Sequence, residues 1–445
     1  MDRLLGTAAL IVWLVTAAIQ LAFALPLKHD EAAYLIGAER LLAGEPAVWL
    51  YRSIGTELLA VPGIALGGSI TTIRILPALV TLLVPIGAWR LARAVYPDRA
   101  LGGWAAAVLA GAHPMILQNA SVLGDLPAAG LVVVGCAVLV RELSRPDGAS
   151  WRIAGAAPLL VAAFYVRYGS VPALLAIAVA SVIVYGRAIV RRPLPVIATV
   201  ALALILVVPH VVASLDRTGS VLGILRTSAA STRFVYAGEG LVTYLTENPF
   251  AYYGYLAAPV VAIGIVAGIA LRDRRAGFVA LVGIATLAIL GWKSHAQPRY
   301  AFAVVALLVV VGVGGVARAL ELAARPRPLV IASVAAIAVC WIAALGWTIS
   351  TARARDAREP FRELAQQIAH DAAGRPCMIV AAREPQLAYY SGCEGEAWPS
   401  RDVGRRRVYV VSLPGRPQEP AFIAAGAPYH PLPGADGVVV IDQPR

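Results

Sequence analysis

The sequence predicts a mainly α-helical, polytopic membrane protein with about eleven transmembrane helices and a small external α/β domain at its C-terminal end. Hydrophobic residues make up 59% of the 445 residues and charged residues only 14%, whereas a soluble globular protein is about half apolar and about a quarter charged. Apolar runs of about 20 residues, the length that crosses a bilayer, recur along most of the chain.

The charge pattern is the third observation, and it orients the helices. The net charge is +12, and Lys and Arg gather in short loops between the apolar runs, as they do in cytoplasmic loops of membrane proteins. We therefore expect the N-terminus inside, and we assign the basic loops to topology and to contacts with anionic lipids. No nucleic-acid-binding motif accompanies these cations, so no nucleic-acid partner is expected.

The predicted spans begin with the N-terminal apolar run. Residues 4–25 are too long for the apolar part of a signal peptide and lack a small-residue cleavage site, so we expect an uncleaved first helix. The other spans are roughly 73–92, 101–118, 126–140, two short helices within 153–186, 194–213, three helices that end near Arg272, Trp292 and Arg318, and 329–349. Together they predict a transmembrane domain of residues 1–350.

The first external loop of this domain is predicted to cover residues 26–72 and to contain amphipathic helices. Its stretch 56–67 is short and interrupted by Pro62 and Gly63, which suits an interfacial helix better than a span.

Residues 351–445 differ in composition and predict the small external α/β domain. Runs rich in Val and Ile at 378–380, 408–411 and 438–441 indicate strands, and a helical pattern starts near 360. Both cysteines of this part, Cys377 and Cys393, are expected to form a disulfide if the domain faces an oxidising compartment.

An acidic pair, Asp30-Glu31, follows the first predicted span, and Tyr34 and an amphipathic run come after it. Loop carboxylates usually just face water at a helix end, and that interpretation stays open. A carboxylate at the membrane surface can also act as a base next to a lipid-borne substrate. We therefore take Asp30 and Glu31 as candidate catalytic residues and Tyr34 as a candidate substrate contact.

Asp125 stands before Pro127 at the start of a predicted helix. Asp is a preferred N-cap residue, so a capping role is one interpretation. The other is a catalytic role in a cleft that Asp125 shares with Asp30 on the outer face. Two carboxylates in one cleft repel each other, which raises the pKa of one of them and suits it to act as a general base. The same pair of carboxylates is also a candidate site for a divalent metal such as Mg, Mn or Ca.

Several cations on the predicted outer face break the positive-inside pattern, so they are candidates for function, together with the aromatic and His side chains beside them. Lipid phosphates need such donors. The candidates for substrate binding are Arg52, Arg167, Tyr168, Lys293, His295, Arg299 and Tyr300. For any single one of them, snorkelling or a place in an interfacial aromatic belt is the alternative.

These motifs, in this order over roughly residues 1–350, resemble the C-type integral-membrane glycosyltransferases. The most similar branch is that of the protein O-mannosyltransferases and lipid A aminoarabinose transferases. The start of that family's second span is similar to Arg74-Ile75-Leu76-Pro77-Ala78-Leu79, its Asp after the third span to Asp125, and a late element to Arg299-Tyr300. The chain departs from the family at Arg52-Ser53-Ile54-Gly55, where a Lys-Pro-Pro motif is expected, and Arg167 stands near another expected Lys.

The high content of Ala, Arg and Gly suggests a GC-rich bacterial genome, so we expect a bacterial plasma membrane, and the charge pattern predicts an active site and a C-terminal domain outside the cytoplasm. The resemblance implies an enzyme. It would move a sugar from a polyprenyl-phosphate donor to a lipid, glycan or protein acceptor. Asp30 would be the base, Glu31 and Asp125 would orient substrate or a metal, and the external cations would hold the leaving phosphate. A single displacement would invert the anomeric configuration.

Two other functions stay open at this point. A transporter or lipid flippase is one, although transporters keep ionisable residues near the bilayer midplane and often contain inverted repeats, and neither pattern is visible here. The other is a non-catalytic protein that binds lipid-linked sugar.

Overall fold

The computed structural model describes residues 1–45, 52–230, 236–247, 249–270, 273–322, 326–353, 359–381, 384–396, 407–411, 429–435 and 437–441. It comprises two compact units, which we call the membrane unit (Met1–Ala22 with Ala47–Ser350) and the C-terminal unit (Phe23–Pro46 with Thr351–Arg445). One boundary between the two units lies between Ser350 and Thr351. The first part of the external loop, which we expected in the transmembrane domain, instead packs with the C-terminal unit.

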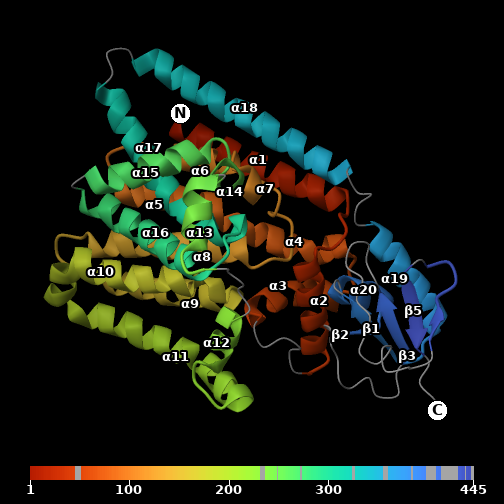
Figure 1. Cartoon of the computed structure of the whole chain (residues 1–445). Coiled ribbons are helices and arrows are strands. Elements are labelled where there is room, and N and C mark those ends of the chain that lie inside the picture. Colours follow the sequence, from red (N-terminus) through yellow and green to blue (C-terminus); the bar gives the residue numbers. More distant parts are fainter. Residues whose placement is uncertain are drawn as a thin grey trace. The chain divides into compact units, whose positions relative to one another are not determined.

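The membrane unit is helical throughout its regular structure (Figure 1). Its α-helices are α1 (Asp2–Ala22), α3 (Ile54–Ala65), α4 (Ile70–Thr81), α5 (Leu83–Val95), α6 (Gly102–Ala110), α7 (His113–Ile116), α8 (Asp125–Leu143), α9 (Ala156–Val166), α10 (Val171–Arg191), α11 (Pro193–Thr218), α12 (Gly223–Ala230), α13 (Glu239–Val242), α14 (Pro249–Tyr253), α15 (Ala257–Ala270), α16 (Arg274–Lys293), α17 (Phe302–Leu322) and α18 (Pro326–Arg353). Short turns of other helical types are η1 (Trp151–Gly155), η2 (Tyr168–Ser170), η3 (Thr243–Glu247) and η4 (Pro298–Ala301).

Within the described residues, eight helices are long and apolar enough to cross a membrane, and three shorter apolar helices accompany them. This confirms a multi-pass membrane protein. The short apolar helix predicted at 56–67 is present as α3. One predicted span is wrong in detail: 101–118 is not continuous, because the chain breaks at Gly111 and Ala112 between α6 and α7.

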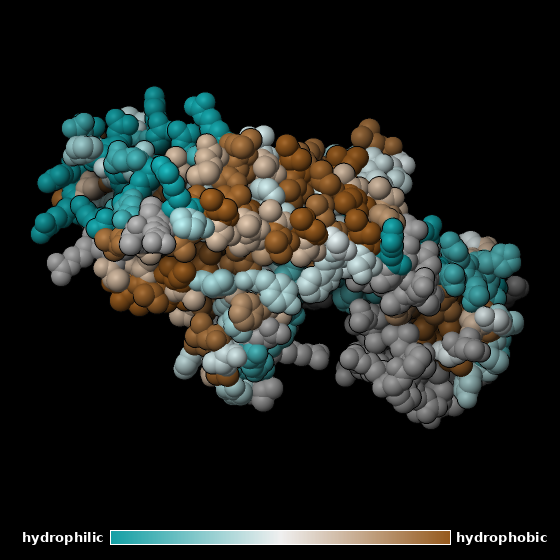
Figure 2. Space-filling model, turned by 90° about the horizontal axis from the view of Figure 1, so that it is seen from above, coloured by the Kyte–Doolittle hydropathy of each residue, from teal (hydrophilic) through white to brown (hydrophobic). Residues whose placement is uncertain are grey.

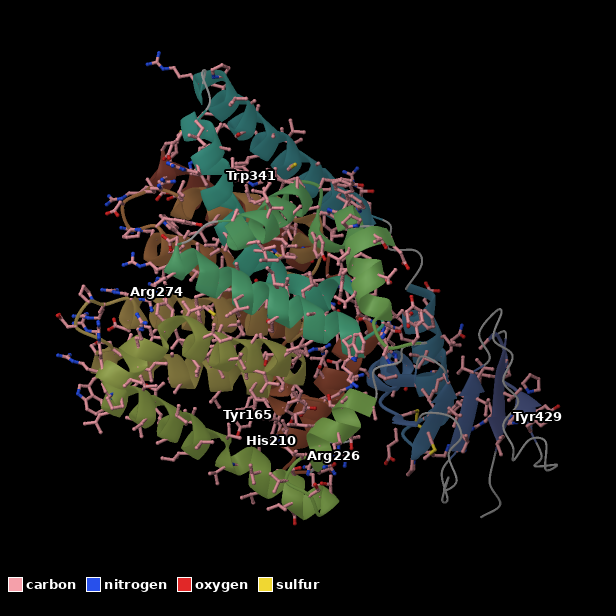
Figure 3. The ribbon with its side chains drawn as sticks, turned by 60° about the vertical axis from the view of Figure 1, so that its left-hand side comes forward. Tyr165, His210, Arg226, Arg274, Trp341 and Tyr429 are labelled. Carbon is pink, nitrogen blue, oxygen red and sulfur yellow. A yellow bond between two sulfur atoms is a disulfide. The ribbon has the colours of Figure 1, made fainter. Side chains whose placement is uncertain are left out.

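Burial separates central helices from peripheral ones. The apolar window of α8 is 83% buried and that of α17 is 72% buried, whereas those of α11 and α18 are only 11% buried. Figure 1 shows α11 and α18 along opposite edges of the membrane unit. Since their apolar side chains are exposed in the protein alone, lipid is the environment that suits them. The Trp341 indole N–H of α18 donates to the Ala107 carbonyl of α6 and attaches this peripheral helix (Figure 3).

Figure 2 shows the same division at the surface, with apolar side chains over the flank of the membrane unit and polar ones gathered at one end. Arg274, the first residue of α16, donates from its guanidinium to the Val184 carbonyl of α10 (Figure 3). An apolar flank with a cationic rim is what the sequence pattern predicts for a bilayer protein.

The C-terminal unit is the predicted α/β domain with one addition, α2 (His29–Leu42). Its other elements are α19 (Glu359–Ala372), α20 (Glu384–Ser391), β1 (Cys377–Ala381), β2 (Glu394–Glu396), β3 (Arg407–Val411), β4 (His430–Pro431) and β5 (Val438–Ile441). The strand order is β2-β1-β3-β5-β4, with β1 parallel to β2 and β3, and β5 antiparallel to β3 and β4. The three predicted strands and the predicted helix near 360 are all present.

Candidate active site

An ion pair between Asp125 and Arg167 lies at the centre of the candidate site in the membrane unit. Asp125 is in the first turn of α8, and its Oδ1 is 3.1 Å from Arg167 Nε. The N-cap of α8 is Gly124, and no side chain caps this helix. The capping interpretation of Asp125 is therefore wrong, because its carboxylate faces a guanidinium and not the backbone of its own helix. Within the described residues, Asp125 Oδ2 is buried without a hydrogen-bond partner.

The segment before Arg167 is held by the start of α3. Ser53 Oγ and Thr56 Oγ1 both donate to the Val166 carbonyl at 2.6 Å. Two glycines let the segments approach: a Cβ on Gly55 would lie 2.6 Å from the Tyr165 carbonyl group, and one on Gly124 would lie 2.4 Å from the Val166 oxygen. Arg167 itself is extended, with φ −153° and ψ 115°, and ends α9. The side chain that pairs with Asp125 is thus fixed by three elements.

This contact explains one departure from the family pattern. Where the family has Pro-Pro after its Lys, this chain has Ser53 and Ile54 after Arg52. Ser53 uses its hydroxyl to hold the Val166 carbonyl, so a serine at this position serves tertiary structure. Nothing in the sequence alone indicates this bond, because it joins residues 113 positions apart.

Aromatic and amide groups continue the site from Arg167 to the start of α17. The Tyr300 ring lies 5.6 Å from the guanidinium carbon of Arg167 and equally far from that of Arg299. Arg299 Nε donates to Gln297 Oε1 at 2.8 Å, and Gln297 Nε2 is 2.8 Å from His295 Nε2. These contacts bring four of the predicted residues together, and they include one residue that the sequence did not single out, Gln297, whose amide connects Arg299 with His295.

The turn that carries this cluster has a strained residue. Ala296 has φ +34°, a conformation that costs an L residue free energy, and its side chain is buried. On the other side of the turn, the Tyr244 hydroxyl donates to the Gln297 carbonyl at 3.1 Å. Since strained backbone persists only where its surroundings fix it, the turn presents its cations in one arrangement.

Tyr168 and Tyr165 attach the Arg167 segment to α11. The Tyr168 hydroxyl is 3.4 Å from His210 Nδ1. The Tyr165 hydroxyl donates to the Leu206 carbonyl and accepts from the His210 N–H, two groups four residues apart that a regular helix would bond to each other. Pro209 stands beside this opening. Figure 3 shows Tyr165 and His210 close together.

A buried carboxylate that the sequence did not indicate lies next to this arrangement. Glu57, in the first turn of α3, is 1% exposed, and within the described residues neither of its oxygens has a hydrogen-bond partner. α3 has 12 residues, too few to span a bilayer. Burial raises the pKa of Glu57 to about 7, and the charges of Arg52 and Arg217 oppose that rise. Arg52 thus lies close enough to Glu57 to act on it electrostatically.

Lys293 differs from the other predicted cations. It ends α16 with its side chain exposed, and it does not join the contacts that connect Arg167, Tyr300, Arg299 and His295. An exposed ammonium at this position is compatible with the snorkelling alternative.

The predicted carboxylates Asp30 and Glu31 belong to the C-terminal unit, in the first turn of α2. Glu31 is fully buried, and its Oε2 accepts the Lys28 backbone N–H at 3.0 Å. That bond gives Glu31 a role at the start of α2. Asp30 is half-buried. Tyr34 is 1% exposed, so its ring lies in the interior.

A divalent metal does not gain a ligand set from these positions. Among the described residues, no three His, Cys, Asp or Glu side chains gather in a way that could hold an ion. Asp125 already faces the Arg167 guanidinium. The metal role of Asp30 and Asp125 stays a prediction. In the C-terminal unit, the sulfurs of Cys377 and Cys393 are bonded to each other.

Comparisons with known proteins agree with this architecture. Residues 52–212, less than half of the chain, match the dolichyl-phosphate-mannose-protein mannosyltransferase family. The structure is similar to ArnT from Cupriavidus metallidurans bound to undecaprenyl phosphate, with a TM-score of 0.73 at 16% identity over 100% of this chain and 99% of that one. ArnT from the same organism in the apo state gives 0.72 at 15% identity, with the same coverage.

A more distant likeness is to the oligosaccharyltransferase of Archaeoglobus fulgidus in the apo form, with a TM-score of 0.51 at 14% identity over 88% of this chain and 64% of that one. No curated protein sequence is similar enough to count as a match. The chain has the fold of the C-type integral-membrane glycosyltransferases, and the resemblance predicted from the sequence is confirmed.

Proposed function

We propose that this protein is a glycosyltransferase that moves a sugar from a polyprenyl-phosphate donor to an acceptor hydroxyl or amine at the outer face of a bacterial plasma membrane. The observation that carries the proposal is the cluster of Arg167, Tyr300 and Arg299 beside Asp125, in a fold shared with a transferase that binds undecaprenyl phosphate. Guanidinium groups fixed by a carboxylate, an amide and an aromatic ring are preorganised donors for a phosphate.

In the proposed reaction, Asp30 takes a proton from the acceptor. The acceptor atom then attacks the anomeric carbon of the sugar, and the bond between that carbon and the phosphate oxygen breaks. The electron pair of that bond leaves with the polyprenyl phosphate, and Arg167 and Arg299 hold the charge that develops on it. Attack from the face opposite the phosphate inverts the anomeric configuration. The donor carries its own leaving group, so the reaction needs no nucleotide.

Asp125 contributes by fixing Arg167. A guanidinium whose Nε is engaged by a carboxylate still has its two terminal NH2 groups to offer a phosphate. The same guanidinium lies over the Tyr300 ring, and this cation–π contact limits its motion. Arg52, which precedes the helix that holds Val166, is the further cation that we assign to the phosphate.

The test is transfer from a panel of radiolabelled polyprenyl-phosphate sugars to native membrane acceptors, with purified wild type beside Asp30→Asn. We expect transfer by wild type and none by Asp30→Asn, with binding of undecaprenyl phosphate retained by both. The matched control is Asp216→Asn, an exposed carboxylate in the last turn of α11. It should transfer as wild type does.

Two results would contradict the proposal. Equal transfer by wild type and Asp30→Asn would exclude Asp30 as the base. No transfer from any donor by a protein that still binds undecaprenyl phosphate would favour a lipid-linked-sugar binding protein or a transporter.

A further inference from the structure

The chain segment before Asp30 is bonded through its backbone to a helix of the C-terminal unit. Leu27 lies between α1 and α2, outside regular structure, and its side chain is fully buried. The Leu27 N–H donates to the Tyr390 hydroxyl at 2.9 Å, and Gln386 Nε2 donates to the Leu27 carbonyl. Both backbone polar groups of one loop residue are therefore satisfied by side chains of α20.

The two side chains suit this task by their spacing. Gln386 and Tyr390 are four residues apart on α20, so they lie on one face of the helix. Gln386 is 3% exposed. A buried backbone N–H or carbonyl that loses its partner costs about 1–3 kcal/mol. Separation of the loop from α20 would leave both backbone groups of Leu27 unpaired, so the two bonds hold the loop on α20 as long as both side chains are present.

The connection from Leu27 to Asp30 is short and fixed. The Lys28 N–H donates to Glu31 Oε2, and the Ala32 N–H donates to the Lys28 carbonyl. Glu31 thereby closes the first turn of α2 over the residue that follows Leu27. Since α2 begins at His29, only Lys28 separates the anchored Leu27 from the helix that carries Asp30.

Helix α20 is itself fixed to the sheet. It is the crossover between the parallel strands β1 and β2, and Leu387 and Ala388 are buried on it. The disulfide between Cys377, at the start of β1, and Cys393, just before β2, closes the loop that contains α20. The order of attachment therefore runs from the sheet through α20 to Leu27 and then to α2.

We infer that Gln386 and Tyr390 are positioning residues for Asp30, so that the C-terminal α/β domain is a working part of the transferase. This rests on the proposed function in one respect, the role of Asp30 as base. The bonds to Leu27 hold the base at one place and in one orientation. A fixed position matters because a general base must lie within hydrogen-bond distance of the acceptor hydroxyl.

The experiment compares the full-length double variant Gln386→Ala/Tyr390→Phe with wild type in two assays. Hydrogen exchange of residues 27–34 is the first, and we expect faster exchange at the Leu27 amide and the first turn of α2, with β1 and β3 as protected as in wild type. Transfer kinetics are the second, with kcat expected to fall about tenfold or more and the KM for the donor to stay within about twofold. A purely structural weakening would not separate kcat from KM in this way.

The matched control is Gln367→Ala/Tyr429→Phe, which makes the same two changes at exposed positions of the same unit (Tyr429 is labelled in Figure 3). Unchanged exchange at residues 27–34 in the test variant would overturn the inference, as would faster exchange with an unchanged kcat. If wild type transfers no sugar, the exchange result still decides whether α20 anchors the loop, so failure of the proposed function is recognised separately.

Discussion

Two helices of the membrane unit begin with a buried carboxylate, and the two carboxylates are compensated in different ways. At the start of α8, Asp125 is 6% exposed and has the Arg167 guanidinium 3.1 Å away. At the start of α3, Glu57 is 1% exposed and lies near Arg52 and Arg217, but neither of its oxygens is hydrogen-bonded within the described residues.

The difference shows that a countercharge in direct contact compensates a buried carboxylate better than countercharges at a longer distance. A paired and hydrogen-bonded carboxylate repays part of the cost of leaving water. Glu57 has only longer-range attraction, and burial outweighs it, so the pKa of Glu57 rises to about 7. The region of α8 therefore offers a fixed cation site, while the region of α3 offers a group whose charge changes near neutral pH.

The largest expected effect comes from removing the ion-pair partner of Asp125, so that this carboxylate, like Glu57, has no countercharge in direct contact. Arg167→Leu leaves a buried carboxylate without its partner, which costs about 3–5 kcal/mol when a buried pair is broken. It also removes a phosphate donor, for which we expect a loss of about 10²–10³ in kcat. Thermal unfolding in detergent and the transfer assay measure the two effects.

Arg226→Leu is the matched control, since Arg226 is exposed on α12 (Figure 3). It should change neither the unfolding temperature nor the transfer rate appreciably. An Arg167→Leu variant as stable as Arg226→Leu would show that the ion pair does not stabilise the start of α8.

The second prediction concerns the pH dependence that Glu57 creates. Its pKa is about 7 in the folded chain and about 4.5 in the unfolded one, so between these values the folded protein binds one more proton. The free energy of unfolding should thus fall as pH rises from about 4.5 to about 7, by at most about 3 kcal/mol, and level off above. Glu57→Gln removes this dependence.

The measurement is the unfolding temperature of Glu57→Gln minus that of wild type across this range. We expect the difference to become more positive from pH 5 to pH 8. Glu247→Gln, at an exposed position of the same unit, is the control. A difference that stays constant with pH would mean that Glu57 does not take up a proton on folding.

The sequence predicted most of the fold and only part of the site, for physical reasons. Spans, strands and α19 follow from local patterns of apolar residues, and these were found. The break at Gly111 and Ala112 was missed because the apolar run continues through it. Asp125 and Arg167 were found as polar residues on the predicted outer face.

What the sequence could not predict are bonds between distant segments. In the sequence, Gln297 does not differ from other polar residues, and only the structure shows that its amide contacts both Arg299 and His295. Glu57 is one carboxylate in an apolar run, and only its burial makes it unusual. The attachment of Leu27 to α20 joins residues more than 350 positions apart, and no local pattern encodes it.

Tyr165 holds the Arg167 segment from the side of α11. Tyr165→Phe removes the hydroxyl that bridges the Leu206 carbonyl and the His210 N–H. We expect a loss of about 1–2 kcal/mol in the free energy of unfolding, because two backbone groups lose a partner. Tyr255→Phe, at an exposed tyrosine, is the control. Equal stability of the two variants would show that α11 closes its own hydrogen bond when the hydroxyl is absent.

The smallest effect is expected at the strained turn beside Tyr300. Ala296→Gly relieves a positive φ and should raise the free energy of unfolding by less than about 1 kcal/mol. Ala373→Gly, at φ +49° after α19, should give a similar gain. The two variants should differ in transfer: Ala296 holds the backbone that presents Gln297 and Arg299, so a glycine there loosens the cations and lowers kcat, whereas Ala373→Gly leaves kcat unchanged. Equal kcat in both would mean that the side-chain contacts among Gln297, Arg299 and Tyr300 suffice to hold the phosphate donors without a rigid turn.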